Sequence, residues 1–245
     1  MRAYSTQFGT AQIHLRNPLI SAFWSFAFPG CGTLAQGRLL KGLILIIWEL
    51  TVNGSAKVNL AIMYSLLGKF EMAKQVINER WFLLYASLYV YAIWDSYRGS
   101  VALNQQYILA DREDASIRPF VLKTYEQNPL DTRNPLLASA LSLLAPGLGH
   151  LYVNKLISGM FFIAWTIVVM YFSHALPAVQ ATMLGHYDQA IRIVNMQWLM
   201  YLPSIYGFVL HDACVAAVEL NKLAEKEQSK FLRDNYQPSN FKMPL

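Results

Sequence analysis

The sequence predicts an all-α, multi-pass membrane protein made of two homologous helical units. The 245-residue chain is 55% hydrophobic and only 14% charged, whereas soluble domains carry about 25% charged residues. One uncharged and almost unbroken apolar run, residues 156–176, is long enough for a helix to cross a hydrocarbon core of about 30 Å, and two shorter runs, residues 81–93 and 198–210, can each extend to about 18 residues. Residues 16–104 also align without a gap with residues 133–221, which lie 117 positions later. This self-similarity indicates a tandem duplication.

The alignment defines the organisation of the chain. About two dozen of the 89 aligned pairs are identical, against about six expected by chance. Arg16 is aligned with Arg133, each at the start of an Arg-Asn-Pro-Leu motif, and Asp95 is aligned with Asp212. We therefore predict five regions: an N-terminal segment (1–15), membrane repeat 1 (16–104), a cytoplasmic linker (105–132), membrane repeat 2 (133–221) and a C-terminal tail (222–245).

Each repeat is expected to begin with a short apolar helix, at residues 19–28 and 136–145. An Asn-Pro pair precedes it, and proline suits the first turn of a helix. The helix should break at a Pro-Gly-x-Gly motif, because proline disfavours helical geometry in the residue before it and glycine adopts backbone angles closed to other residues. The residues of this motif are Pro29, Gly30 and Gly32 in repeat 1, and Pro146, Gly147 and Gly149 in repeat 2.

Two membrane-crossing helices are expected to follow in each repeat. The first starts after a basic turn, at Leu39 or Leu156. A polar connector with a short amphipathic helix, near residues 70–78 or 187–195, leads to the second. That last helix opens with a tryptophan, whose ring favours the membrane interface, and carries an aspartate near its inner end. The two tryptophans are Trp81 and Trp198.

The first helix of each repeat has about ten residues, or about 15 Å, which is half a membrane. It is therefore either re-entrant or continues across, giving four or six crossings in all. Lys and Arg are enriched on the cytoplasmic side. A re-entrant helix places 15 of the 20 Lys and Arg on one side, whereas a full crossing splits them 12 to 8. The sequence favours the re-entrant arrangement in the cell membrane, with both termini cytoplasmic and the repeats packed about a pseudo-two-fold axis along the membrane normal.

Carboxylates in apolar helices are costly unless they are paired or at the interface. Asp95 and Asp212 are either a proton- or ion-handling pair or members of structural ion pairs. The candidate partners are Arg16 or Arg38 in repeat 1, and Arg133 or Lys155 in repeat 2. Glu49 lies inside a predicted crossing where repeat 2 has Thr166, so it is a functional candidate unless it reaches the far interface. Asn104 and Asn221, nine residues after the aspartates, are expected to cap helix ends.

The sequence gives no pattern for catalysis, a cofactor or a metal. The glycine pairs lack both phosphate-loop patterns, and neither HExxH nor CxxC occurs. The two cysteines, Cys31 and Cys214, are not equivalent between repeats and are expected to be free thiols. The net charge of +5 comes mostly from residues that flank membrane segments, so nucleic acid is not an expected partner. The expected partners are the lipid bilayer and other membrane subunits or a second copy.

One stretch carries a family resemblance. Pro146-Gly147-Leu148-Gly149-His150-Leu151-Tyr152, followed by Lys155 and Gly159, resembles the two-transmembrane-segment domain family, whose members are hairpins with a Gly-rich, aromatic and basic turn. The first repeat is similar but lacks the aromatic residue. The chain also resembles duplicated membrane proteins of Gram-positive, often spore-forming, bacteria. The resemblance covers about 40 residues of each repeat and implies no catalytic activity.

These features lead to two function hypotheses. The first is a non-enzymatic integral membrane component that acts as an assembly, scaffold or accessory subunit. The alternative is a small solute or ion transporter or channel, with a site between the repeats at the Pro-Gly-broken helices. A transport path should have polar residues paired between the repeats. Glu49 with Thr166, and Lys41 with Ser158, do not pair well, which favours the first hypothesis.

Overall fold

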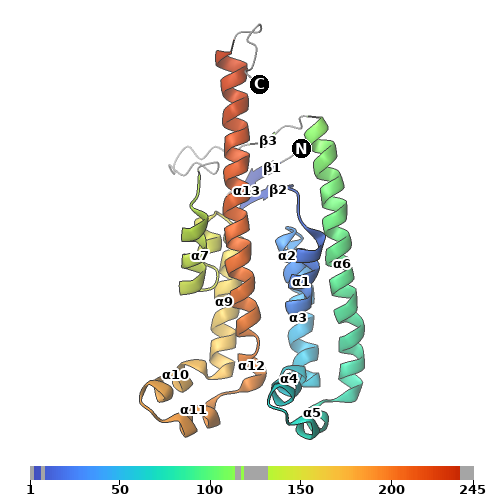
Figure 1. Ribbon diagram of the computed structural model, residues 1–245, viewed down its shortest axis with the longest axis vertical. Coiled ribbons are helices and arrows are strands. Elements are labelled where there is room, and N and C mark those ends of the chain that lie inside the picture. The colour runs from blue at the N-terminus through green and yellow to red at the C-terminus, as the bar shows by residue number, and fades with distance from the viewer. Residues whose placement is uncertain (1–2, 7–8, 114–116, 119–131, 238–245) are drawn as a thin grey trace.

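The computed structural model describes residues 3–6, 9–113, 117–118 and 132–237. The described chain is almost entirely helical, and its long helices run along one axis (Figure 1). Parts of three predicted regions lie outside the described residues. These parts are residues 1–2 and 7–8 of the N-terminal segment, residues 114–116 and 119–131 of the linker, and residues 238–245 of the tail.

The first half of the chain, residues 16–112, forms six helices. They are α1 (Pro18–Ala27), α2 (Cys31–Ala35), α3 (Leu39–Ala56), α4 (Val58–Leu66), α5 (Phe70–Val76) and α6 (Glu79–Arg112). The predicted short helix, second helix and amphipathic helix correspond to α1, α3 and α5. The sequence did not predict α2 or α4, and α6 continues beyond residue 104 into the region expected to be linker.

The second half, residues 133–236, forms seven helices. They are α7 (Pro135–Leu144), α8 (Leu148–Tyr152), α9 (Leu156–Ser173), α10 (Ala175–Met183), α11 (Tyr187–Ile193), α12 (Met196–Leu199) and α13 (Leu202–Tyr236). The bounds of α1–α5 recur in α7–α11 at a constant spacing of 117 residues. The counterpart of α6 is divided into α12 and α13, because Pro203 has no amide proton for a continuous helix and starts a new one instead.

A small sheet joins the start of the chain to the region between the halves. Strands β1 (Ala3–Thr6) and β2 (Gly9–Gln12) form an antiparallel hairpin, and β3 (Ile117–Arg118) pairs in parallel with β1. The strand order is β2-β1-β3. These strands were not predicted from the sequence. The predicted all-α class holds for the helical body, and the sheet is an addition to it.

Three helical segments of the described chain are long and apolar enough to cross a membrane: α3, α9 and the stretch Met196–Tyr236 that contains α12 and α13. Helix α6 has 34 residues but does not meet the same criterion, because tyrosines and Asp95 interrupt its apolar stretch. Helices α1 and α7 are apolar but short. The described fold is therefore helical, with three segments that suit a membrane in length and composition, as the composition predicts.

The main apolar cluster lies between the halves. Phe28 and Ile46 of the first half pack with Tyr201, which directly precedes α13, and with Ile205 and Phe208 of α13. The ring of Phe28 lies 5.7 Å from that of Tyr201 in an edge-to-face arrangement, which suits aromatic pairs. Helix α13 therefore covers the α1–α3 side of the first half.

The reciprocal contact does not form. Leu84 and Tyr91 of α6 occupy the positions equivalent to Tyr201 and Phe208, but they are 49% and 41% exposed. A two-fold axis would bury both sets alike. The expectation of a pseudo-two-fold axis is therefore wrong. The halves stand in a row instead, with α7, α9 and α13 beside α1, α3 and α6 (Figure 1).

Candidate functional site

The Pro-Gly-x-Gly motifs lie where α1 meets α2 and where α7 meets α8. Gly30 and Gly147 have φ of +99° and +105°, which L side chains rarely adopt. A Cβ on Gly32 would lie 2.2 Å from the Ser21 carbonyl oxygen, and one on Gly149 would lie 2.2 Å from that of Ala138. Both turns therefore pack backbone against backbone, which makes the motif a close-packing element rather than an open phosphate loop.

Contacts with α6 show the path of α1. The Arg16 amide donates to Asn104 Oδ1 at 2.9 Å, and Asn104 Nδ2 donates to the Arg16 carbonyl at 2.7 Å. One turn into α1, Ser21 accepts a hydrogen bond from the Ser100 hydroxyl at 2.7 Å. At the end of α1, the Phe26 carbonyl accepts from the hydroxyl of Tyr89. Helix α1 therefore runs antiparallel to α6, from the level of residue 104 to that of residue 89.

The chain then returns along α6 before α3 begins. Gln36, directly after α2, donates from Nε2 to the Ser96 carbonyl and to the Ser100 hydroxyl. Helix α3 then runs in the same direction as α1 and reaches the start of α6. Its last residue, Ala56, accepts a hydrogen bond there from the amide of Asn78, the N-cap of α6, at 3.1 Å. The segment from Arg16 to Gln36 thus runs along α6 to the level of Tyr89 and turns back along the same helix.

The second half repeats two of these contacts. Arg133 and Asn221 exchange the same pair of hydrogen bonds, at 2.7 and 2.8 Å. The Asn195 amide donates to the Ser173 carbonyl at 2.9 Å. Because Asn104 and Asn221 lie inside α6 and α13, the expectation that they cap helix ends is wrong. They bind the backbone of the residue that precedes each Asn-Pro pair.

The arginines of the two motifs do not pair with the aspartates. The Arg16 guanidinium donates to the Ala35 carbonyl, and that of Arg133 lies over the Tyr152 ring, 5.4 Å from its centroid. Ala35 and Tyr152 are at equivalent positions. Both arginines therefore anchor the end of the short second helix of their half.

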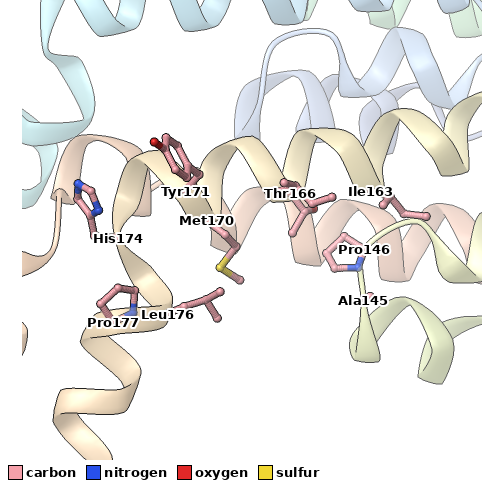
Figure 2. A pocket seen from close by; sticks show the side chains of 10 residues that line it. Ala145, Pro146, Ile163, Thr166, Met170, Tyr171, His174, Leu176 and Pro177 are labelled. Atoms are coloured by element: carbon pink, nitrogen blue, oxygen red, sulfur yellow. The ribbon is translucent and has the colours of Figure 1, made fainter.

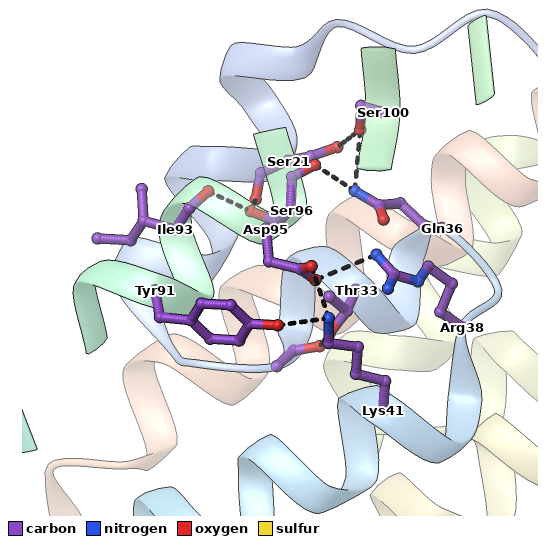
Figure 3. Close-up of polar contacts among 11 residues, drawn as sticks. Ser21, Thr33, Gln36, Arg38, Lys41, Tyr91, Ile93, Asp95, Ser96 and Ser100 are labelled. Atoms are coloured by element: carbon purple, nitrogen blue, oxygen red, sulfur yellow. Dashed lines mark hydrogen bonds and ion pairs between the residues drawn. The ribbon is translucent and has the colours of Figure 1, made fainter. Parts of the chain in front are cut away.

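Asp95 is held by two cations, Arg38 and Lys41 (Figure 3). Arg38 Nη1 lies 3.1 Å from Asp95 Oδ2, and Lys41 Nζ lies 2.5 Å from Oδ1. Lys41 also donates to the Tyr91 hydroxyl at 2.9 Å. Of the partners considered from the sequence, Arg38 forms the ion pair, and Lys41, one turn later, was missed. The available signal was the i, i+3 spacing of two cations at the start of α3, where Arg38 is the N-cap residue and Lys41 lies in the first turn.

Asp212 has an equivalent arrangement with one partner exchanged. Lys155 Nζ and His150 Nε2 both lie 3.0 Å from Asp212 Oδ2. Lys155 is equivalent to Arg38, whereas His150 is equivalent to Thr33 and replaces the contact that Lys41 makes in the first half. Both aspartates are almost completely buried, so each carboxylate is paired in the way that burial demands.

A buried group of four residues has opposite polarity in the two halves. In the first half, Ser21, Gln36, Ser96 and Ser100 are joined by hydrogen bonds (Figure 3). The equivalent positions of the second half hold Ala138, Val153, Ala213 and Ala217, which pack as an apolar cluster. A buried polar group is stable when its members are bonded to one another, and an apolar one needs no bonds. The two sets are therefore alternative ways to fill the same space.

Glu49 lies in a polar network at the joint between the halves. Its side chain is buried, with 3% exposed. Its Oε1 accepts from Asn53 Nδ2 at 2.7 Å and from the Tyr85 hydroxyl at 3.3 Å. Its Oε2 has no hydrogen-bond partner among the described residues. Glu49 is therefore enclosed by the protein, and one of its two carboxylate oxygens has no partner among the described residues.

Gln197 of α12 extends this network across the joint. Its Nε2 donates to Asn53 Oδ1 at 2.7 Å, and its Oε1 accepts from the Leu60 amide at 2.9 Å. Its carbonyl accepts from Asn59 Nδ2 at 3.0 Å. These bonds connect α3 and α4 to α12 where the apolar cluster ends.

The second half has a groove of about 500 Å³ on the side that faces away from the first half (Figure 2). It lies between the end of α7, one face of α9 and the start of α10. Its lining includes Ala145, Ile163, Thr166, Ile167, Met170 and Leu176. We call this set the open groove.

The remaining sequence-predicted residues have structural surroundings. Trp198 stacks on Phe172 at 4.8 Å, whereas Trp81 is 40% exposed at the start of α6. Cys31 and Cys214 are free thiols. Among the described residues, no group of three or more His, Cys, Asp or Glu side chains is placed to hold a metal ion.

Comparison with known protein families, with curated proteins and with solved structures finds no match to this chain.

Proposed function

We propose that the chain is a tandem pair of homologous membrane units, and that it acts as a non-enzymatic assembly, scaffold or accessory subunit of a complex in the cell membrane. Three recurrences support the duplication. The helix bounds repeat at 117 residues, the asparagine bonds to the Arg16 and Arg133 backbones repeat, and so do the aspartate ion pairs.

We further propose that α1 and α7 are re-entrant and that both units have the same orientation, with cytoplasmic termini. Helix α6 serves as a ruler, since each residue of a helix rises by about 1.5 Å. The span from Asn78 to Asn104 is then about 39 Å, and Tyr89, beside the end of α1, lies about 16.5 Å from one end and about 22.5 Å from the other. The chain thus goes partway along α6, to the level of Tyr89, and is back at the level of Ser96 by Gln36. Such a path supports a re-entrant segment.

The single observation that carries the scaffold proposal is the pairing of the two buried aspartates. A carboxylate that binds and releases protons or ions must be free to exchange partners, but Asp95 and Asp212 each contact two basic side chains within 3.1 Å. Removing one partner of such a pair is strongly destabilising. These groups therefore hold the basic turns against α6 and α13 and stabilise a rigid support.

The test is flux through liposomes that contain the purified protein. A scaffold predicts proton and cation flux no greater than that of protein-free liposomes. Flux that disappears in a folded Asp95→Asn, Asp212→Asn double variant would contradict the proposal. Cross-linking in native membranes followed by purification should in turn recover the chain in a complex larger than its own 27.8 kDa.

The free oxygen of Glu49 favours a second candidate, a small transporter or channel. A buried carboxylate oxygen without a partner inside a membrane helix is a functional candidate by default. Glu49→Gln keeps an acceptor for Asn53 and Tyr85 and removes only the charge. Measurable flux in the wild type that Glu49→Gln abolishes, without loss of thermal stability, would support transport and exclude the scaffold.

A further inference from the structure

The open groove has a counterpart in the first half that is covered. Its residues Ala145, Ile163, Thr166, Ile167, Met170 and Leu176 are equivalent, 117 positions earlier, to Phe28, Ile46, Glu49, Leu50, Asn53 and Asn59. We call this second set the covered face. The two sets occupy the same positions on matching helices, but only one of them has an occupant.

The occupant of the covered face is the α12–α13 segment. Phe28 packs on Tyr201, and Ile46 belongs to the same buried cluster as Ile205. Asn53 and Asn59 bond to Gln197. Beside this face, the Ser204 hydroxyl donates to the carbonyl of Ala27, the last residue of α1, at 3.0 Å.

The face of α6 equivalent to this occupant is uncovered. Leu84, Ser87 and Tyr91 correspond to Tyr201, Ser204 and Phe208, and all three are exposed. Trp94, the counterpart of His211, is 56% exposed, whereas His211 packs against Trp24 at 5.2 Å. One chain therefore carries a vacant groove at one side and an unused copy of the helix face that fills such a groove at the other side.

We propose that the open groove binds α6 of a second copy of this chain, in the way that the covered face binds α12–α13. The inference rests on the proposed pair of homologous membrane units. The occupied interface within the chain supplies the argument for the occupant, because the same positions meet there. The equivalent of the Ser204 bond would run from Ser87 of one copy to the Leu144 carbonyl of the other. Ala145 and Leu84, which are smaller than Phe28 and Tyr201, would meet where that aromatic pair meets within the chain.

The contact would be heterologous, since the two surfaces differ. Such contacts form a ring when the rotation closes and an open row when it does not. Either a ring or an open row is consistent with the proposed contact, in which each open groove binds the α6 of another copy.

The experiment is disulfide cross-linking in native membranes, with Cys31 and Cys214 first replaced by alanine. In one variant, Ser204→Cys with Ala27→Cys reports the interface within one chain. In the other, Ser87→Cys with Leu144→Cys reports the proposed contact between chains. We expect a monomer with an internal disulfide from the first pair, and covalent dimers or a ladder of multiples from the second.

The matched control replaces Ser87→Cys with Ala86→Cys. Ala86 is exposed like Ser87 but is equivalent to Pro203, which stays exposed beside the internal interface. It should give at least tenfold less covalent dimer than Ser87→Cys does. Equal cross-linking from both positions would indicate random collision and would overturn the proposal.

Failure of the self-association and failure of the two-unit arrangement give different results. An internal disulfide without an intermolecular one overturns the self-association, and leaves the groove to lipid or to a different subunit. Absence of the internal disulfide as well overturns the arrangement of two units on which the inference depends.

Discussion

At the scale of single residues, the fold depends on side chains that satisfy backbone groups at helix starts and turns. Asn17 and Asn134 cap α1 and α7 by accepting from the Leu19 and Leu136 amides at 2.9 Å. Asn104 and Asn221 bind the backbones of Arg16 and Arg133, the residues directly before these caps. Unpaired backbone groups in an apolar environment are costly, so these asparagines have a direct structural reason to recur at both ends of the 117-residue spacing.

Asn104→Ala should lower the free energy of unfolding by about 1–3 kcal/mol, because it removes one acceptor and one donor and leaves the Arg16 backbone groups unpaired. Thermal unfolding of the purified protein in detergent measures the loss. The exposed neighbour Gln105 provides the control, since Gln105→Ala should change stability by less than about 0.5 kcal/mol. Equal effects from both variants would exclude the proposed role of the bonds.

His14 makes stability depend on pH. Burial lowers the pKa of His14 from 6.5 to about 4, with a further lowering by Arg16, although Glu219, 3.6 Å away, raises it. Between about pH 4 and pH 6.5 the unfolded chain therefore binds more protons than the folded one, and stability falls as the pH falls. The loss at pH 5 is about 2 kcal/mol relative to pH 7.

The melting temperature of the wild type should therefore fall more between pH 7 and pH 5 than that of His14→Gln, which cannot gain the proton. The other charged groups that face His14 are Arg16, Glu219 and Lys155, and all three are present in both proteins. Identical pH profiles would show that His14 is not the titrating group.

At the scale of helices, the sequence predicted those elements whose boundaries have a local cause. The starts of α3 and α9 at Leu39 and Leu156, and of α1 and α7 after Asn-Pro, follow from turns, caps and glycines. Helices α4 and α10 were missed, because a lysine and a histidine begin them in the left-handed conformation instead of glycine. Lys57 has φ of 58° and His174 has φ of 53°. The strands were missed because their sequences, AYST, GTAQ and IR, are short and lack the apolar run of a buried strand.

Close packing at the Pro-Gly-x-Gly turn gives a sharp test. Gly32→Ala should destabilise the protein by more than about 3 kcal/mol, or prevent folding, because its Cβ would lie 2.2 Å from a backbone oxygen. Gly54→Ala in α3, where no atom lies within 4 Å of the added Cβ, should stabilise the protein by about 0.5–1 kcal/mol. Folding yield and melting temperature in detergent compare the two. A tolerated Gly32→Ala would mean that α1 and α2 do not pack this closely.

The polar and apolar groups of four should be interchangeable as sets. Gln36→Val alone should cost about 1–3 kcal/mol, because it leaves the Ser96 and Ser100 oxygens without their partner. Addition of Ser21→Ala, Ser96→Ala and Ser100→Ala, which copies the set of the second half, should recover most of that loss. The measurement is a thermal melt of both variants beside the wild type. A quadruple variant less stable than Gln36→Val would show that the two spaces are not equivalent.

At the scale of the whole molecule, the relation between the halves could not be read from the sequence. Duplication predicts that two similar units exist, but the choice between a two-fold axis and a row depends on residues that differ between the copies. Glu49, Asn53 and Asn59 bond to one another and to Gln197, whereas Thr166, Met170 and Leu176 at the equivalent positions offer no such set. That divergence gives one face an internal partner and leaves the other open.

The same divergence explains why the candidate site was only partly anticipated. Asp95, Asp212 and Glu49 stood out because charge is rare in apolar helices. Gln197 connects the network of Glu49 to the second half. In the sequence it is an ordinary polar residue next to Trp198, at a predicted membrane interface. Long-range partners of this kind follow from how the halves pack, and no local pattern encodes that packing.

The central claim is that two membrane units share one orientation and that each contains a re-entrant first helix. Arg38 and Lys155 occupy the equivalent turns between that helix and the first full crossing. Single cysteines at these positions, in a background without Cys31 and Cys214, can be labelled from one side of sealed vesicles with a membrane-impermeant maleimide. A cysteine at Arg233 serves as the marker of the tail side, and cysteines at Lys69 and His186 mark the other side.

The account predicts that cysteines at Arg38 and Lys155 are both labelled from the side that labels the cysteine at Arg233, and that those at Lys69 and His186 are labelled only from the opposite side. If the first helix of each unit crossed the membrane completely, the second unit would be inverted. Labelling of the Arg38 and Lys155 positions from opposite sides would therefore contradict the account.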